Sequence, residues 1–171
     1  MLDTIEAEVR VAGPADEDDL IKLCRARHAE EHLRALEAKP FPFSEEATRR
    51  TLHRALVAGH NDPNISSAWC GVIGAAGHPI MGSVFLSVQT PFDSDQPYLS
   101  EMWNWVYPQY RKSDIPSKLF AFSQTKAEEF RMFLIGSVIA DEAESPKMRF
   151  FKRKGCQNLG SMYVYDAQTG V

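Results

Sequence analysis

Apolar residues recur at two different spacings along this chain, and the spacing changes from one segment to the next. Glu6–Ala12 alternates polar and apolar residues, as a half-buried strand does. From Asp16 the spacing becomes helical. The apolar face of this first helix is predicted to hold Leu20, Leu23, Cys24, Leu33 and Leu36. A second helix is predicted from Ser44, where Ser44-Glu45-Glu46 forms an acidic helix start, to about Ala58.

Beyond residue 65 the spacing of apolar residues shortens to two. Ser67–Ala75 and Ile80–Gln89 are predicted to be strands joined by a turn, and Tyr98–Tyr107 to be a third strand. A helix is then predicted from Asp114 to Phe130, followed by a strand over Met132–Ala140.

The last predicted elements complete the topology. Ser145-Pro146 begins a helix, because proline is favoured at the first helical position, and Ser161–Tyr165 is the last strand. The order β-α-α-β-β-β-α-β-α-β begins as a meander and ends in helical crossovers. We expect a single α+β (mixed α/β) domain over residues 1–171. Its three layers would comprise a central mixed sheet of about six to seven strands flanked by about four helices.

Composition narrows the class of protein. The 171 residues carry a net charge of −4, from 19 basic and 23 acidic residues, which argues against a dedicated nucleic-acid binder. Three widely spaced cysteines form no metal-binding pattern and predict reduced thiols in the cytoplasm. The first residues lack the basic and apolar regions of a signal peptide, and no apolar run reaches the roughly 20 residues that span a bilayer. We therefore expect a cytoplasmic protein without a membrane partner.

The candidate chemistry is concentrated in residues 101–120, EMWNWVYPQYRKSDIPSKLF. The predicted strand ends at Tyr107, a short basic turn with Arg111 and Lys112 follows, and a helix begins near Asp114. The first backbone N–H groups of a helix and its dipole favour anions, and cations in the preceding turn add to that preference. This order predicts a site for a phosphate-bearing ligand; the alternative is a solvated basic turn.

The same segment resembles the cofactor loop of the GNAT acyltransferases, which often reads V-x-P-x-Y-R-G-x-G-I-G-x-x-L. The residues in register with that pattern are Val106, Pro108, Tyr110, Arg111, Ile115 and Leu119. A second similarity is Ser145-Pro146 followed by Phe150-Phe151 and then Gly155, like the family's helix that ends in an aromatic pair. These matches cover about the C-terminal half of the chain, and the order of elements extends the resemblance over the rest.

The resemblance implies an N-acyltransferase that moves acetyl from acetyl-coenzyme A to an amine by direct attack in a ternary complex. It implies that acetyl-coenzyme A is held by Trp105, Val106, Arg111, Lys112, Ser113, Asp114, Ile115, Ser117, Lys118 and Phe151. The acceptor would be a small molecule or a protein. Glu101 would be the general base, directly or through a water that Asn104 could orient. The alternative for Glu101 is a solvated residue at the start of a strand.

Two departures from the family pattern concern this chemistry. Asp114 and Pro116 stand where the family has glycines: a carboxylate repels a bound anion, and proline has no N–H to donate. The same two residues favour a helix start, with Asp114 as its N-cap. Phe151 stands where many members have a tyrosine taken as the general acid, a role that Tyr163 or Tyr165 could fill. These departures support the alternative of a GNAT fold that has lost catalysis and acts as a binding or structural module.

A competing motif lies in the first helix. Residues 28–32, HAEEH, fit the pattern H-x-x-E-H, which places His28 and His32 one helical turn apart with Glu31 as a base. No third ligand is singled out, and the high charge is typical of an exposed helix face, so we expect no metal. The tryptophans of the strand Tyr98–Tyr107 are expected to be core or interface aromatics. Phe41 and Phe43 are expected to cover the acceptor site or to form a homodimer contact.

Overall fold

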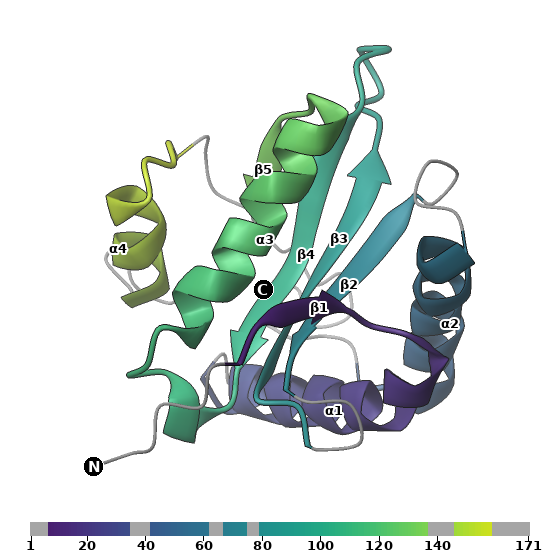
Figure 1. Cartoon of the computed structure of the whole chain (residues 1–171), viewed down its shortest axis with the longest axis vertical. Coiled ribbons are helices and arrows are strands. Elements are labelled where there is room, and N and C mark those ends of the chain that lie inside the picture. The colour runs from purple at the N-terminus through teal and green to yellow at the C-terminus, as the bar shows by residue number, and fades with distance from the viewer. Residues whose placement is uncertain (1–6, 35–41, 62–66, 75–78, 137–145, 159–171) are drawn as a thin grey trace, which may run out of the picture. The chain divides into compact units, whose positions relative to one another are not determined.

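The computed structural model describes residues 7–34, 42–61, 67–74, 79–136 and 146–158 (Figure 1). The chain divides into two compact units, with bounds Met1–Arg27 and Ser44–Ser137 for the larger and His28–Phe43 and Val138–Val171 for the smaller. The elements in chain order are β1 (Val9–Val11), η1 (Pro14–Asp16), α1 (Glu17–Arg34), α2 (Glu45–Asn61), β2 (Ala68–Ile73), β3 (Gly82–Gln89), β4 (Tyr98–Val106), η2 (Pro108–Tyr110), α3 (Ile115–Phe130), β5 (Leu134–Gly136) and α4 (Pro146–Arg153).

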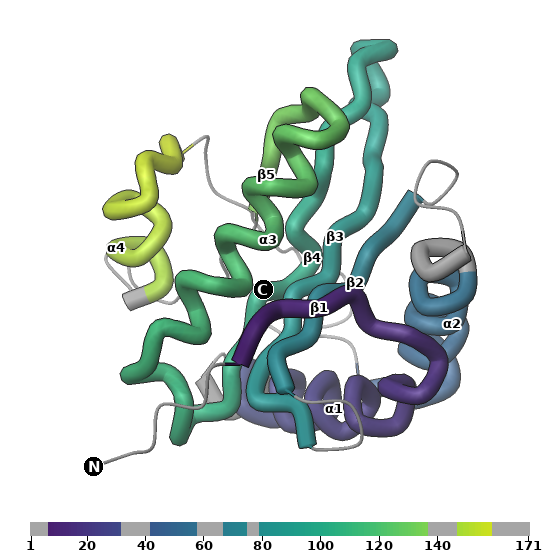
Figure 2. The backbone as a smooth tube through the Cα atoms, in the orientation of Figure 1, coloured from purple at the N-terminus to yellow at the C-terminus, as the bar shows by residue number. Residues whose placement is uncertain are grey.

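The described strands form one mixed sheet in the order β1-β2-β3-β4-β5. The first four strands pair antiparallel as a meander, and β5 pairs with β4 in parallel. The backbone trace in Figure 2 shows this course of the chain. This confirms the predicted mixed α+β fold with four helices, although five strands are described instead of six to seven. The predicted strand Ser161–Tyr165 lies outside the described residues, as does the second half of the predicted strand Met132–Ala140.

A β-bulge in β4 decides which side chains face which layer. Trp103 pairs with Phe85 while Glu101 pairs with Leu86, so Met102 is the extra residue between them. Phe85 and Leu86 are neighbours on β3 and therefore point to opposite faces of the sheet. Without the bulge, Glu101 and Trp103 would share a face; with it, they point to opposite faces.

Helix α3 covers the face of the sheet to which Glu101 points. Leu119 of α3 is fully buried and belongs to one apolar cluster with the strand residues Trp69, Ile73, Val84, Leu86, Leu99 and Val106. Gly71 in β2 permits the close approach of the helix, because a Cβ atom there would lie 2.9 Å from the Phe122 ring. The burial of this apolar surface holds α3 on the sheet.

The opposite face carries a buried aromatic and polar cluster. Phe85 stacks on Trp103 with ring centroids 4.6 Å apart, and the Arg27 guanidinium of α1 lies 5.5 Å from the centroid of the Trp103 ring. Trp103 Nε1 donates to Ser83 Oγ at 3.3 Å, and Cys70 Sγ lies 3.4 Å from the same oxygen. Burial raises the pKa of the Cys70 thiol to about 12, so the thiol stays protonated at neutral pH. Trp103 is therefore a core aromatic, as predicted.

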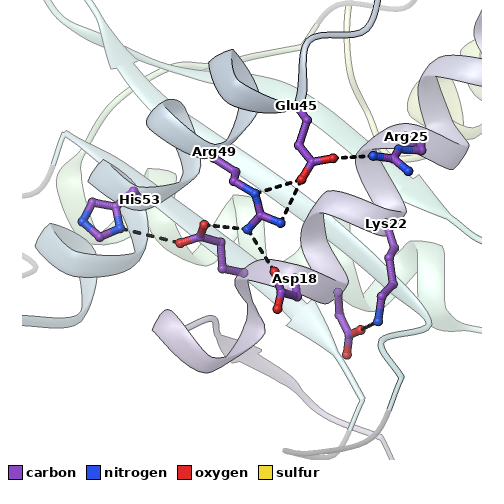
Figure 3. Close-up of polar contacts among 8 residues, drawn as sticks. Asp18, Lys22, Arg25, Glu45, Arg49 and His53 are labelled. Atoms are coloured by element: carbon purple, nitrogen blue, oxygen red, sulfur yellow. Dashed lines mark hydrogen bonds and ion pairs between the residues drawn. The ribbon is translucent and has the colours of Figure 1, made fainter.

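An ionic cluster joins the first turns of α1 and α2 (Figure 3). The Arg49 guanidinium donates to Asp18 at 2.9 Å and to Glu17 and Glu45 at 3.0 Å, and Glu45 also pairs with Arg25. Hydrogen bonds to Asp18, Glu17 and Glu45 raise the pKa of Arg49 above its ordinary value. Because these side chains are partly exposed, the cluster orients the two helix starts more than it stabilises the fold.

Candidate functional site

Glu101 lies in the middle of β4, and only 4 % of its surface is exposed. Ser123, on the buried face of α3, donates its hydroxyl to Glu101 Oε2 at 2.9 Å. Asn104 Nδ2 lies 3.5 Å from the same oxygen. Donors of this kind offset part of the cost of burying a carboxylate. The alternative of a solvated residue at a strand start is wrong, because the bulge directs Glu101 under α3.

Glu101 lies beside the last described residue of β5. β5 pairs with Leu99, Ser100 and Glu101, and with no later residue of β4 in the described part of the chain. Gly136, the β5 partner of Glu101, is exposed. A Cβ atom at Gly136 would lie 3.7 Å from both Cβ and Oε1 of Glu101, so the glycine packs directly against this side chain.

The Arg111 side chain is held against the end of β4. Its Nε donates to Val106 O at 2.9 Å, and its guanidinium lies 5.4 Å from the centroid of the Trp105 ring. Tyr107 meets Trp105 edge-on with centroids 4.8 Å apart, and burial raises the pKa of Tyr107. The structure thus brings together three of the residues predicted for acetyl-coenzyme A, Trp105, Val106 and Arg111, around the strand end.

The start of α3 is capped by a different residue from the one predicted. Ser113 Oγ accepts the Ile115 N–H at 3.2 Å and donates to Tyr110 O at 2.6 Å. Asp114 occupies the N-cap position, but its side chain makes no capping hydrogen bond. The capping role that the sequence assigned to Asp114 therefore belongs to the hydroxyl of Ser113.

The Asp114 carboxylate instead pairs with the side chain one turn further on. Lys118 Nζ lies 2.9 Å from Asp114 Oδ2 and also donates to Ala7 O at 3.3 Å. The hydrogen bond from Lys118 lowers the pKa of Asp114. Because Pro116 has no N–H, the Ser117 N–H is the first-turn donor that makes no hydrogen bond within the described residues.

At this helix start, some groups favour the binding of a diphosphate and one group disfavours it. Lys112 is exposed and forms no ion pair with a described residue, and the Ser117 N–H points out of the first turn; both are compatible with a phosphate group. The Asp114 carboxylate is not compatible with a phosphate group, because it repels the anion, and it also forms an ion pair with Lys118. The residues present fit a diphosphate once the Asp114–Lys118 pair opens, which releases a second cation.

Two predicted site residues lie outside the described part of the larger unit. Phe151 lies in α4, in the smaller unit, with its ring centroid 5.4 Å from that of Phe150 and 5.8 Å from Lys147 Nζ. Tyr163 and Tyr165 lie outside the described residues. The roles of Phe151 and Tyr163 therefore remain predictions.

The described residues offer no support for a metal centre. The His28 ring lies against Phe43, with centroids 5.6 Å apart, and the side chain of His32 is outside the described part. No group of three or more His, Cys, Asp or Glu residues among those described is arranged to hold a metal ion. Within the same residues, no helix has the length and apolar character needed to cross a membrane.

Ser123 is the residue of this site that sequence reasoning missed. Its signal was weak: a polar residue on the apolar face of the predicted helix, four residues from both Leu119 and Ala127. Helical spacing places Ser123 on the buried face, but it does not show that a strand carboxylate lies opposite.

Solved structures that share this fold include several acetyltransferases. A candidate acetyltransferase from Arthrobacter sp. FB24 is 19% identical, covers 92% of this chain and 94% of its own, and has a TM-score of 0.65. The aminoglycoside 6'-N-acetyltransferase AAC(6')-IG from Acinetobacter haemolyticus is 13% identical over 93% and 97% of the two chains, with a TM-score of 0.66. AAC(6')-Iy, in complex with the bisubstrate analogue CoA-S-monomethyl-acetylneamine, is 12% identical over 94% and 97%, with a TM-score of 0.67.

These similarities define the class of fold. The chain has the fold of the GNAT-type acetyltransferases, as the resemblance of residues 106–119 predicts. At such low identities the likeness concerns the fold alone. Neither a protein-family model nor a curated protein sequence matches the chain.

Proposed function

We propose that this protein is an acyl-coenzyme A-dependent N-acyltransferase that moves acetyl from acetyl-coenzyme A to an amine. One observation carries the proposal: a buried carboxylate, Glu101, is held by Ser123 next to the bulge of β4 and beside Gly136 of β5. The fold around it is shared with acetyltransferases over more than nine-tenths of each chain. A carboxylate held in this way could serve as a general base.

In the proposed reaction Glu101 takes a proton from the acceptor amine, directly or through one water. The neutral amine then attacks the thioester carbonyl, so that a C–N bond forms as the C–S bond breaks. The leaving thiolate takes a proton from a general acid, for which Tyr163 is the proposed residue, since Phe151 has no proton to give. The nitrogen loses its second proton as the amide forms, and that proton restores Tyr163 through solvent. Glu101 returns its proton to solvent when the amide leaves.

The ligand would lie along the residues that the family resemblance implies. The backbone of Trp105 and Val106 would hold the pantetheine arm and the acyl carbonyl, and residues 111–118 would hold the diphosphate. The most direct contacts are Lys112 and the Ser117 N–H, together with Lys118 once it leaves Asp114. The acceptor is an amine of a small molecule or a protein, as AAC(6')-IG takes an aminoglycoside by its name. A cytoplasmic location would give access to acetyl-coenzyme A.

A second candidate function is supported by the start of α3. Asp114 holds Lys118, Pro116 removes one donor, and Ser113 occupies the Ile115 N–H, so little of the helix start is ready for an anion. These features favour a GNAT fold that binds a partner or ligand without turning over acetyl-coenzyme A.

Calorimetric titration with acetyl-coenzyme A, followed by measurement of thiol release with a panel of amines, separates the two candidates. The panel should contain an aminoglycoside, a polyamine and a peptide with a free N-terminus. We expect binding below about 1 mM and turnover with at least one amine. Glu101→Gln should keep the binding and lose about 100-fold or more of the turnover.

The matched control is Glu129→Gln, an exposed glutamate of α3 paired with Lys126, which should leave both readouts unchanged. Absence of binding at about 1 mM would sink the enzyme proposal. Tight binding without turnover for any amine would favour the binding module instead.

A further inference from the structure

Ser123 donates a buried hydrogen bond to the Glu101 carboxylate. The serine is fully buried in the middle of α3, and its Oγ lies 2.9 Å from Glu101 Oε2 and 3.4 Å from Leu119 O. A hydroxyl has one proton to donate, and both neighbours are acceptors. The contact to Glu101 Oε2 is the shorter of the two and takes that proton.

The contact holds one oxygen of the carboxylate and thereby orients the other. Asn104 Nδ2, from the same strand, also approaches Oε2, at 3.5 Å. With Oε2 held from the helix side, Oε1 lies toward Gly136, where an added Cβ atom would be 3.7 Å away. Gly136 is the β5 residue that pairs with Glu101. A long, rotatable glutamate side chain thus has one of its oxygens fixed to α3 and the other near Gly136 of β5.

We infer that Ser123 is a positioning residue for Glu101: by donating to Oε2 it fixes the carboxylate so that Oε1 lies on the side of Gly136 and β5, where the acceptor amine or its bridging water gives up a proton. The inference rests on the proposed function, because only acyl transfer gives Glu101 a proton to take. Ser123 touches neither substrate in this arrangement and acts through the carboxylate alone.

A purely structural role for Ser123 predicts different behaviour, and the chain offers a matched control. Ser83 is also fully buried and also hydrogen-bonded, since it accepts from Trp103 Nε1 at 3.3 Å, but it lies on the opposite face of the sheet from Glu101. Ser83→Ala therefore removes a buried hydroxyl of the same kind without changing any contact of Glu101. Ser123→Ala removes both the hydroxyl and the support of the base.

The kinetic test compares Ser123→Ala, Ser123→Thr, Ser83→Ala, Glu101→Gln and the double variant Glu101→Gln/Ser123→Ala in the full chain. We expect Ser123→Ala to lower kcat about ten-fold or more, with the KM for acetyl-coenzyme A changed by less than about two-fold. Ser123→Thr, which keeps the hydroxyl, should recover most of kcat. In the Glu101→Gln background the loss of Ser123 should have no further effect, because two residues that act as one unit are not additive.

A spectroscopic test does not depend on activity. With glutamate labelled by carbon-13 at its carboxyl carbon, the resonance missing from Glu101→Gln identifies Glu101. Ser123→Ala should move this resonance, and Ser83→Ala should leave it in place. Ser123→Cys, close to serine in size and a weak donor, replaces Ser123→Ala in both tests if the alanine variant does not fold.

The outcomes distinguish the two proposals. An unmoved Glu101 resonance in a folded Ser123→Ala or Ser123→Cys protein overturns the inference, whether or not the protein is active. Equal kcat losses in Ser123→Ala and Ser83→Ala, or a further loss in the double variant, overturn it as well, because the role would then be structural. A moved resonance in a protein that acetylates no amine shows instead that the proposed function is wrong while Ser123 still controls the Glu101 carboxylate.

Discussion

The first turn and the middle of α3 use polar side chains in opposite ways. In the first turn, Asp114 pairs with Lys118 four residues later; the Asp114 side chain is largely exposed and that of Lys118 is half-buried. In the middle, Ser123 contacts Glu101, which lies 22 residues earlier on another element, and both are buried. The local pair of Asp114 and Lys118 stays within one turn of the helix, whereas the tertiary pair of Ser123 and Glu101 orients a carboxylate. One helix therefore has a first turn whose charged side chains pair locally and a middle segment whose polar side chain pairs with the sheet.

The largest effect should come from the apolar contacts that hold the middle of α3 in place. Leu119→Ala removes a fully buried side chain one turn before Ser123, and we expect a loss of about 2 to 5 kcal/mol in the free energy of unfolding. Urea denaturation measures this loss. Gln124→Ala, an exposed position of the same helix, should stay within about 0.5 kcal/mol of the parent. A loss below about 1 kcal/mol for Leu119→Ala would mean that the sheet does not hold this part of the helix.

Two strand glycines on the sheet face that α3 covers test the same comparison. Gly71→Ala places a Cβ atom 2.9 Å from the Phe122 ring, so the helix or the ring must move, and we expect a loss of about 1 to 2 kcal/mol. Gly136→Ala places its Cβ atom at an ordinary distance of 3.7 Å and should change stability by less than about 0.5 kcal/mol. Chemical denaturation of both variants gives the two values. Equal losses would contradict the close packing assigned to Gly71.

A partly buried ion pair at the start of another helix tests how much burial increases the contribution of a local ion pair to stability. Arg10 donates to both oxygens of Asp16 at 2.6 and 2.7 Å, and the Gly13 N–H donates to Asp16 at 2.9 Å. These bonds, that of Arg10 first, lower the pKa of Asp16. We expect Asp16→Asn to cost about 1 to 2 kcal/mol at neutral pH.

The sign of the pH dependence follows from the lowered pKa. Asp16 releases its proton more easily in the folded chain than in the unfolded one, so its stabilisation is complete above the unfolded value of about 3.9 and is lost as the pH falls through the folded value. Unfolding free energies between neutral and strongly acidic pH should therefore fall less steeply for Asp16→Asn than for the parent. Glu46→Gln, which breaks an exposed pair with Arg50, should have a smaller effect at every pH. Parallel pH profiles for the parent and Asp16→Asn would contradict this assignment.

Local patterns along the sequence predicted the elements, because each depends on residues close in the chain. The helix from Asp114 to Phe130 and the strand from Tyr98 are found within a residue or two of their predicted ends. The family resemblance of residues 106–119 predicted the fold in the same way, since the loop and helix start form one continuous segment. The N-cap was harder to assign: the sequence predicted Asp114, but Asp114 pairs with Lys118 and the Ser113 hydroxyl makes the capping hydrogen bond.

The candidate site depended on pairings that no local pattern contains. The bulge at Met102 is a property of β3 and β4 together, since it is defined by Phe85 and Leu86 facing Trp103 and Glu101. Reading β4 alone gives a regular alternation that puts Glu101 and Trp103 on one face. The contact between Ser123 and Glu101 follows only after the bulge has turned the glutamate toward α3.

The smallest effect should come from the exposed pair at the start of α3. Asp114→Asn removes one negative charge beside the proposed diphosphate position and frees Lys118, and we expect acetyl-coenzyme A to bind about two- to five-fold more tightly at neutral pH. Calorimetric titration measures this Kd, with Glu129→Gln as a control for the loss of one exposed carboxylate elsewhere on the same helix.

The pH dependence gives the same prediction a second readout. The bond from Lys118 lowers the pKa of Asp114, so the ion pair is complete above the unfolded value and opens as the pH falls through the folded one. The affinity ratio between Asp114→Asn and the parent should therefore shrink toward one on acidification, because the parent's own Asp114 becomes neutral there. If Asp114→Asn binds no more tightly at neutral pH, the start of α3 does not hold the diphosphate. The contacts of the first turn would then serve only to cap the helix. The ligand would have to be held by the strand end alone.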